Sequence, residues 1–172
     1  MSLFFLLLLP FVGCVVAALL PTSARNLVSL WAGTVALAVA LPLALLYPEV
    51  RDGGVIAERI DWLPSLGVNL VVRLDGFAWM FAMLVSAMGL LVIVYARYYL
   101  SPEDPAARFY SLLLGFMGAM LGVVISGNLV QLVVFWELTS LFSFLLIGYW
   151  THRKDARRGA RMAFTVTAAG GL

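Results

Sequence analysis

Five stretches of this sequence are almost free of charged residues, and each is long enough to cross a lipid bilayer. A spanning helix needs about 20 mostly apolar residues to cross roughly 30 Å of hydrocarbon. The sequence therefore predicts an all-α integral membrane fold with five complete transmembrane helices. These helices are expected at residues 3–20, 27–47, 77–99, 109–126 and 129–150.

A sixth apolar stretch begins near Ala160 and continues to Leu172. At 1.5 Å per residue this stretch reaches only about 20 Å, which is less than the thickness of a bilayer. We therefore expect the sequence to stop inside a helix and to be part of a longer protein. The expected organisation is helices 1 and 2 in residues 1–47, a loop in 48–76, and helices 3–5 with the start of a sixth in 77–172.

Composition excludes several classes of protein. Of the 172 residues, 63% are hydrophobic and 12% are charged, whereas a soluble domain has about 45–50% and about 25%. So much apolar surface cannot be hidden in one small core, which excludes a soluble enzyme, a nucleic-acid binder and a disordered chain. The single cysteine, Cys14, lies in an apolar run, so we expect no disulfide framework, no metal site and no cofactor.

The distribution of Lys and Arg predicts the orientation of the helices, because cytoplasmic loops carry an excess of these residues. With the N-terminus outside, eight of the eleven Lys and Arg face the cytoplasm, and three (Arg51, Arg59 and Arg73) face outward. We expect a multi-pass protein of the cell membrane with an extracytoplasmic N-terminus. The eight are Arg25, Arg97, Arg108, Arg153, Lys154, Arg157, Arg158 and Arg161.

The loop at 48–76 is then extracytoplasmic. Within it, residues 55–63 and 68–74 favour β-structure and are separated by Pro-Ser-Leu-Gly at 64–67, which predicts a short hairpin.

Small residues at spacings of three and four form one face of the fourth predicted helix. We expect this face to allow the close backbone approach of another helix, and we assign it to packing. Its members are Ser111, Gly115, Gly118, Gly122 and Ser126.

Glu137 is the one charged residue predicted to lie deep in the bilayer, about 12 Å from the outer end of the fifth helix. A carboxylate there costs roughly 2.5–3.5 kcal/mol on insertion scales. Burial favours the neutral acid and a nearby cation favours the charged form, so such a group can take up and release protons. Ser140 lies one turn further on the same face, so we expect its hydroxyl to hydrogen-bond the carboxyl, and Thr139 flanks this face. The alternative is a buried, hydrogen-bonded acid with a structural role.

Asp75 is a weaker candidate, because it directly precedes the third helix, where a carboxylate is stabilised by the positive end of the helix dipole. That position has an adequate structural explanation.

The sequence Phe-Trp-Glu-Leu-Thr-Ser at 135–140, followed by Phe-Leu-Leu-Ile-Gly-Tyr-Trp at 144–150, resembles the fifth helix of the antiporter-like subunits. These subunits are shared by respiratory complex I, membrane-bound hydrogenases and Mrp-type cation/proton antiporters. Among them, the sequence at 135–140 is most similar to the A subunit of the Mrp antiporters. Further similarities cover the region from about 74 to 172. They are Leu-Asp-Gly-Phe at 74–77, Tyr-Ala-Arg-Tyr-Tyr at 95–99, Arg-Phe-Tyr at 108–110 and Gly-Asn-Leu at 127–129.

The resemblance implies a component of a secondary transporter, not an enzyme, that works with other membrane subunits to exchange Na⁺ or another monovalent cation for H⁺. It implies that Glu137 pairs with a lysine of a later helix, outside this sequence, on a proton path. One alternative is the non-redox, proton-translocating subunit of an NADH:quinone oxidoreductase or hydrogenase complex. Another is a structural membrane scaffold.

Overall fold

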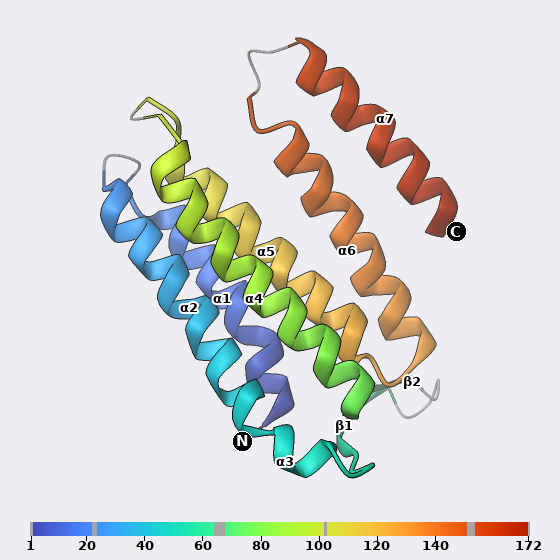
Figure 1. Cartoon of the computed structure of the whole chain (residues 1–172). Helices are drawn as coiled ribbons and strands as arrows, with labels where there is room; N and C mark the ends of the chain where they lie inside the picture. Colours follow the sequence, from blue (N-terminus) through green and yellow to red (C-terminus); the bar gives the residue numbers. More distant parts are fainter. Residues whose placement is uncertain (1, 22–23, 64–67, 102, 151–153, 172) are drawn as a thin grey trace.

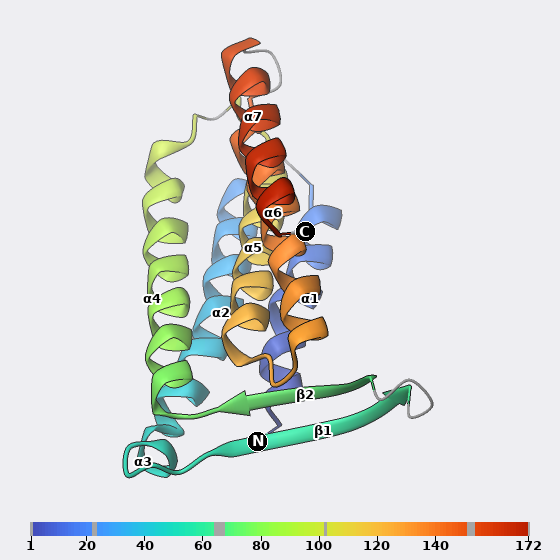
Figure 2. The same ribbon diagram turned by 90° about the vertical axis from the view of Figure 1, so that its right-hand side faces the viewer.

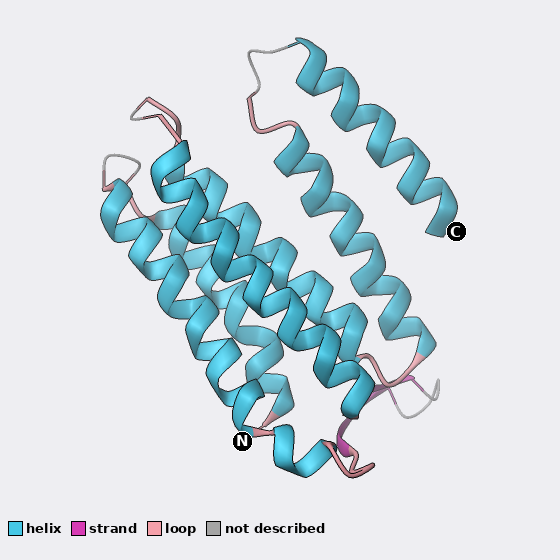
Figure 3. Cartoon of the chain, in the orientation of Figure 1, coloured by secondary structure: helices cyan, strands magenta, loops and turns pink. Residues whose placement is uncertain are grey.

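The structure is a computed structural model that describes residues 2–21, 24–63, 68–101, 103–150 and 154–171. Over these residues the chain is mostly helical, and its strands lie together between α3 and α4 (Figure 3). In chain order the elements are α1 (Leu3–Leu19), α2 (Arg25–Leu45), α3 (Tyr47–Val50), β1 (Ile56–Leu63), β2 (Val68–Leu74), α4 (Gly76–Tyr99), α5 (Ala106–Ile125), α6 (Leu129–Ile147) and α7 (Lys154–Gly171).

The long apolar helices agree with the sequence-based boundaries to within about three residues, because hydrophobic length is a property of each segment alone. Four of them, α2, α4, α5 and α6, are long and apolar enough to cross a membrane. The fifth, α1, is also apolar but has 17 residues.

Helices α1, α2, α4 and α5 form one group, and α6 and α7 follow outside it in sequence order (Figure 1). The central member is α5, which contacts α1, α2, α4 and α6. Two tryptophans join neighbouring helices within the group. Trp31 of α2 donates a hydrogen bond to the Gly13 carbonyl of α1 (3.1 Å), and Trp79 of α4 donates to the Leu43 carbonyl of α2 (2.6 Å).

The small-residue face of α5 serves packing as predicted, but the groups that fill it are aromatic rings and not the backbone of one helix. A Cβ added at Gly115 would lie 2.3 Å from the ring of Phe142, and one added at Gly122 would lie 2.3 Å from Phe135, both on α6. At Gly118 the nearest ring, at 3.0 Å, belongs to Phe11 of α1. The face is therefore shared between α1 and α6.

Strands β1 and β2 pair antiparallel, as the sequence predicted, in the register Ile56↔Leu74 to Ile60↔Leu70. The turn predicted at 64–67 lies outside the described residues. The hairpin extends across one end of the helices (Figure 2). The short helix α3 was not predicted, and the chain leaves it through Gly53, whose positive φ of 85° suits glycine.

Helix α7 begins at Lys154, so the sequence-based start near Ala160 was wrong by about two turns. The basic residues before Ala160 therefore form the first turns of this helix. Lys, Ala and Arg are strong helix formers, and Asp155 lies in the first turn, where an acid is stabilised by the helix dipole.

Candidate functional site

Glu137 lies on α6, and the start of α6 is fixed by the β-hairpin. The Asn128 side chain caps the helix by accepting from the Gln131 N–H (2.9 Å), and it also donates to the Asn69 carbonyl of β2 (2.6 Å). Gln131, which is 5% exposed, accepts from the Val71 N–H through its side-chain oxygen (2.9 Å). These bonds fix where α6 begins relative to the hairpin, and Glu137 follows about two turns later.

The same anchor continues into the α5–α6 turn. The Gly127 N–H donates to the Val71 carbonyl (2.7 Å), and Ser126 forms an isolated β-bridge with Val72. Strand β2 therefore contacts both the end of α5 and the start of α6.

The lateral position of α6 is set by Phe135 and Phe142. Their rings occupy the spaces that side chains would fill at Gly122 and Gly115 of α5, and we call these spaces the Gly122 and Gly115 notches. The Phe135 ring also stacks on Phe11 of α1, with 6.3 Å between ring centroids. Glu137 lies between these two aromatic residues in sequence. Its position is thus fixed by the hairpin along the helix axis and by aromatic packing across it.

Glu137 is half-buried, and its Oε1 atom is buried without a hydrogen-bond partner among the described residues. The expected bond from Ser140 is not found in the structure. The Ser140 hydroxyl (4% exposed) donates to the Trp136 carbonyl at 3.4 Å, and the Thr139 hydroxyl donates to the same carbonyl at 2.6 Å. In the structure both hydroxyls are therefore bonded to the backbone of α6 and not to the Glu137 carboxyl.

The ion pairs formed within the described part of the chain do not include Glu137. A buried acceptor without a donor costs about 1–3 kcal/mol. The cost is removed if the carboxyl carries a proton that is shared with another group, or if a donor reaches it from outside these residues.

Asp75 lies apart from this region, at the junction of β2 and α4. Its carboxylate caps α4 by accepting from the Ala78 N–H (2.9 Å), and it pairs with Arg73 (3.2 Å). The structural explanation proposed from the sequence is therefore present. Sequence reasoning missed the role of Asn128 and Gln131. Asn before an apolar run is a recognisable helix-cap signal, whereas the bond from Gln131 to β2 joins residues far apart in the chain and leaves no local signal.

Two protein-family models match the chain. Residues 62–110 match the N-terminal family of chain 5 of NADH-ubiquinone oxidoreductase (complex I), and residues 126–172 match the transmembrane family of NADH:quinone oxidoreductase and the Mrp antiporter.

Similar proteins include a probable K⁺/H⁺ antiporter A/B subunit of Rhizobium meliloti, which is 57% identical over 96% of this chain and 17% of its own length. The A subunit of the Na⁺/H⁺ antiporter of Alkalihalophilus pseudofirmus is 42% identical over 95% of this chain and 20% of its own length. This chain therefore spans about a fifth of the length of these relatives.

Among solved structures, the Mrp complex from Dietzia sp. DQ12-45-1b contains a chain that matches with a TM-score of 0.85 and 29% identity. The match covers all of this chain and 18% of that one. A chain of an archaeal membrane-bound sulfane sulfur reductase shares the fold, with a TM-score of 0.76 at 22% identity, over 98% of this chain and 26% of that one. The apolar helices and these relatives identify a multi-pass membrane protein. The chain belongs to the NADH:quinone oxidoreductase/Mrp antiporter family of membrane subunits.

Proposed function

We propose that this chain is part of one subunit of a monovalent cation/proton antiporter, and that Glu137 is a proton-transfer group within it. The observation that carries the proposal is the buried Oε1 of Glu137, which lacks a partner among the described residues. A membrane helix accepts the cost of such a group where the group has a function. The antiporter names of the relatives support the exchange of Na⁺ or K⁺ for H⁺ by the whole protein.

In this proposal the partner of Glu137 is a cation on a part of the protein beyond these residues or on another membrane subunit. Thr139 and Ser140 support the site indirectly, because their hydroxyls occupy the Trp136 carbonyl beside it. Asp75 is proposed to act only through the cap of α4.

We further propose that α1 spans the membrane with the four longer helices and that α7 begins a sixth span. This keeps the division into residues 1–47, 48–76 and 77–172. The start of α2, the end of α4 and the start of α7 lie at one end of the bundle, and the hairpin lies at the other (Figure 1). Basic residues are concentrated at the first of these ends, which the positive-inside rule assigns to the cytoplasm. The N-terminus and the hairpin are then extracytoplasmic.

The test is Glu137→Gln in the full protein, assembled with its membrane partners and assayed in everted vesicles. Addition of Na⁺ or K⁺ should dissipate an imposed pH gradient in the parent protein. We expect the Gln variant to slow exchange by about a hundredfold or more, since positioned proton-transfer groups contribute roughly 10²–10⁴ in rate. Glu137→Asp, which keeps a titratable group, should retain part of the exchange. Glu103→Gln, in the exposed loop between α4 and α5, is the matched control.

Normal exchange by an assembled Glu137→Gln protein across the working pH range would reject the proton-transfer role and leave a structural one. Both family models are also named for NADH oxidoreductases. The alternative function is therefore proton transport in a redox-driven complex. Exchange driven by a cation gradient alone, with no electron donor present, would favour the antiporter. Proton transport that requires a redox substrate would favour the alternative.

A further inference from the structure

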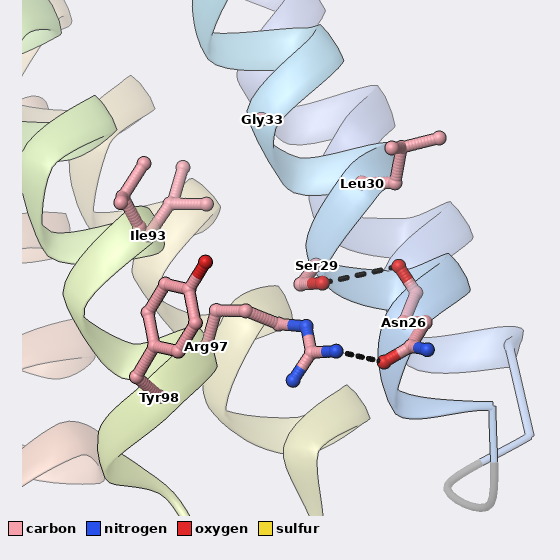
Figure 4. Close-up of a pocket in the computed structure, with 8 residues that line it drawn as sticks. Asn26, Ser29, Leu30, Gly33, Ile93, Arg97 and Tyr98 are labelled. Atoms are coloured by element: carbon pink, nitrogen blue, oxygen red, sulfur yellow. Dashed lines mark hydrogen bonds between the residues drawn. The ribbon is translucent and has the colours of Figure 1, made fainter.

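A groove of about 420 Å³ lies between α2 and α4 (Figure 4). It lies at the start of α2 and the end of α4, which is the end of the bundle opposite the hairpin (Figure 1). One half is polar and the other is apolar. Asn26, Ser29 and Arg97 lie toward the start of α2 and the end of α4, and Leu30 and Gly33 lie deeper along α2 (Figure 4). The remaining lining residues are Ile93, Val94 and Tyr98.

One arginine, Arg97, lines the polar half of the groove, and a second, Arg25, contacts the backbone of Arg97. Arg97 donates to the side-chain oxygen of Asn26, and Arg25 donates to the Arg97 carbonyl in the last turn of α4 (2.6 Å). The Nε of Arg25 is buried and has no hydrogen-bond partner in the described chain. Neither arginine takes part in the ion pairs found between described residues. Two positively charged side chains therefore lie at this end without an ion-pair partner among the described residues. This charge favours an anion.

The apolar half opens on the outer face of the bundle. Leu30 is 70% exposed and Val94 is 53% exposed, so this face is apolar and is not covered by the described part of the chain. A Cβ added at Gly33 would meet no atom nearer than the Ile93 side chain at 4.0 Å. The floor of the groove is therefore open at Gly33.

We propose that this groove binds an anionic phospholipid. The phosphate lies against Arg97, Asn26 and Ser29, and one acyl chain lies along Gly33 and Val94. Guanidinium groups form strong charge-assisted hydrogen bonds with phosphate oxygens. Free phosphate would fill only the polar half of the groove. A lipid fills both halves, with its phosphate on the polar residues and its acyl chain on the apolar ones. Tyr98, which is 84% exposed at the same end, has the interfacial position that aromatic residues favour beside lipid headgroups.

The proposal is tested with the full protein in its assembled complex, delipidated in detergent and titrated with dioleoyl phosphatidylglycerol. Binding is counted by native mass spectrometry. Arg97→Gln removes the charge, and Gly33→Leu fills the apolar half without touching the polar one. Arg51→Gln, on an exposed arginine that pairs with Asp52 near the hairpin, is the control. We expect Arg97→Gln and Gly33→Leu each to weaken the tightest lipid site by about tenfold or more, and Arg51→Gln to leave it unchanged.

Parallel titrations with dioleoyl phosphatidylcholine and with inorganic phosphate separate the alternatives. Equal affinity for phosphatidylcholine would overturn the assignment to an anionic lipid. A second outcome would identify the ligand as a free anion and overturn the assignment to a lipid. In that outcome Arg97→Gln loses binding, Gly33→Leu keeps it, and inorganic phosphate competes with phosphatidylglycerol for the site. Absence of a tight lipid site in the assembled parent complex would overturn the proposal and leave the groove to a neighbouring subunit. Because Gly33→Leu retains both arginines, it keeps the test valid if Arg97→Gln fails to assemble.

Discussion

The packing of α6 on α5 predicts that Gly122→Ala destabilises the protein, although alanine is the better helix former. A Cβ at Gly122 would lie 2.3 Å from both Cγ and Cδ1 of Phe135, where carbon atoms normally sit about 3.5–4.0 Å apart. The shortfall is thus about 1.2–1.7 Å. Rotation about χ2 leaves Cγ in place, and a change of χ1 would break the stacking of the ring on Phe11. Helix α6 itself must shift.

Overpacking of this kind costs about 1–3 kcal/mol, and replacing a helical glycine by alanine gains about 0.8–1.0 kcal/mol. Gly33→Ala on α2 is the matched control, because its Cβ meets no atom nearer than 4.0 Å. It should show the gain without the cost. We therefore expect Gly122→Ala to be less stable than Gly33→Ala by about 1–3 kcal/mol.

The assay is thermal denaturation of the purified full protein, followed by size-exclusion chromatography of a fluorescent fusion. Gly122→Ala should melt below the parent and Gly33→Ala at or above it. Combining Gly122→Ala with Phe135→Leu should recover stability, because contacting residues couple in a double-mutant cycle. Equal melting of the two alanine variants, or no recovery in the double variant, would refute the notch as the determinant of α6 packing.

Two further predictions concern the hairpin end of the bundle. Burial raises the pKa of Glu58, but hydrogen bonds from the Ser2 hydroxyl (2.7 Å) and the Leu3 N–H (2.8 Å) outweigh it and hold the pKa below the usual 4.5. The stabilisation that Glu58 gives to the start of α1 is therefore present above pH 4.5 and is lost as the pH falls through the lowered pKa. Hydrogen exchange of the amides in the first turn of α1 should report this loss. Glu58→Gln should abolish its pH dependence. Asp75→Ala should destabilise the protein by about 0.5–2 kcal/mol through loss of the α4 cap, whereas Asp75→Asn, which still accepts from Ala78, should melt near the parent and retain exchange; loss of exchange in a stable Asn variant would contradict a purely structural role.

The helices and the hairpin could be predicted from the sequence because their signals are local. An apolar run of about 20 residues defines a span wherever its neighbours lie. The place of Glu137 about two turns into α6 follows from counting residues along that helix. The sequence placed the start of α7 too late because the residues before Ala160 are charged. Charge predicts exposure to water but does not exclude helix formation.

The surroundings of Glu137 could not be predicted in this way. Apolar residues lie on every side of α6, and lipid tails are as apolar as a neighbouring helix, so hydrophobicity does not reveal which face meets protein. The sequence suggested Ser140 as the hydrogen-bond partner, but its hydroxyl donates to the Trp136 carbonyl, which is equally near along the helix.

The sequence by itself determined the membrane class, the limits of the long apolar helices, and the isolation of one carboxyl among apolar residues. Tertiary structure alone decided that Phe135 of α6 fills the Gly122 notch of α5 and that Gln131 joins α6 to β2. The physical reason is that these contacts depend on shape and on single hydrogen bonds between residues distant in the chain. Hydrophobicity, which the sequence displays directly, records only how much of each segment avoids water.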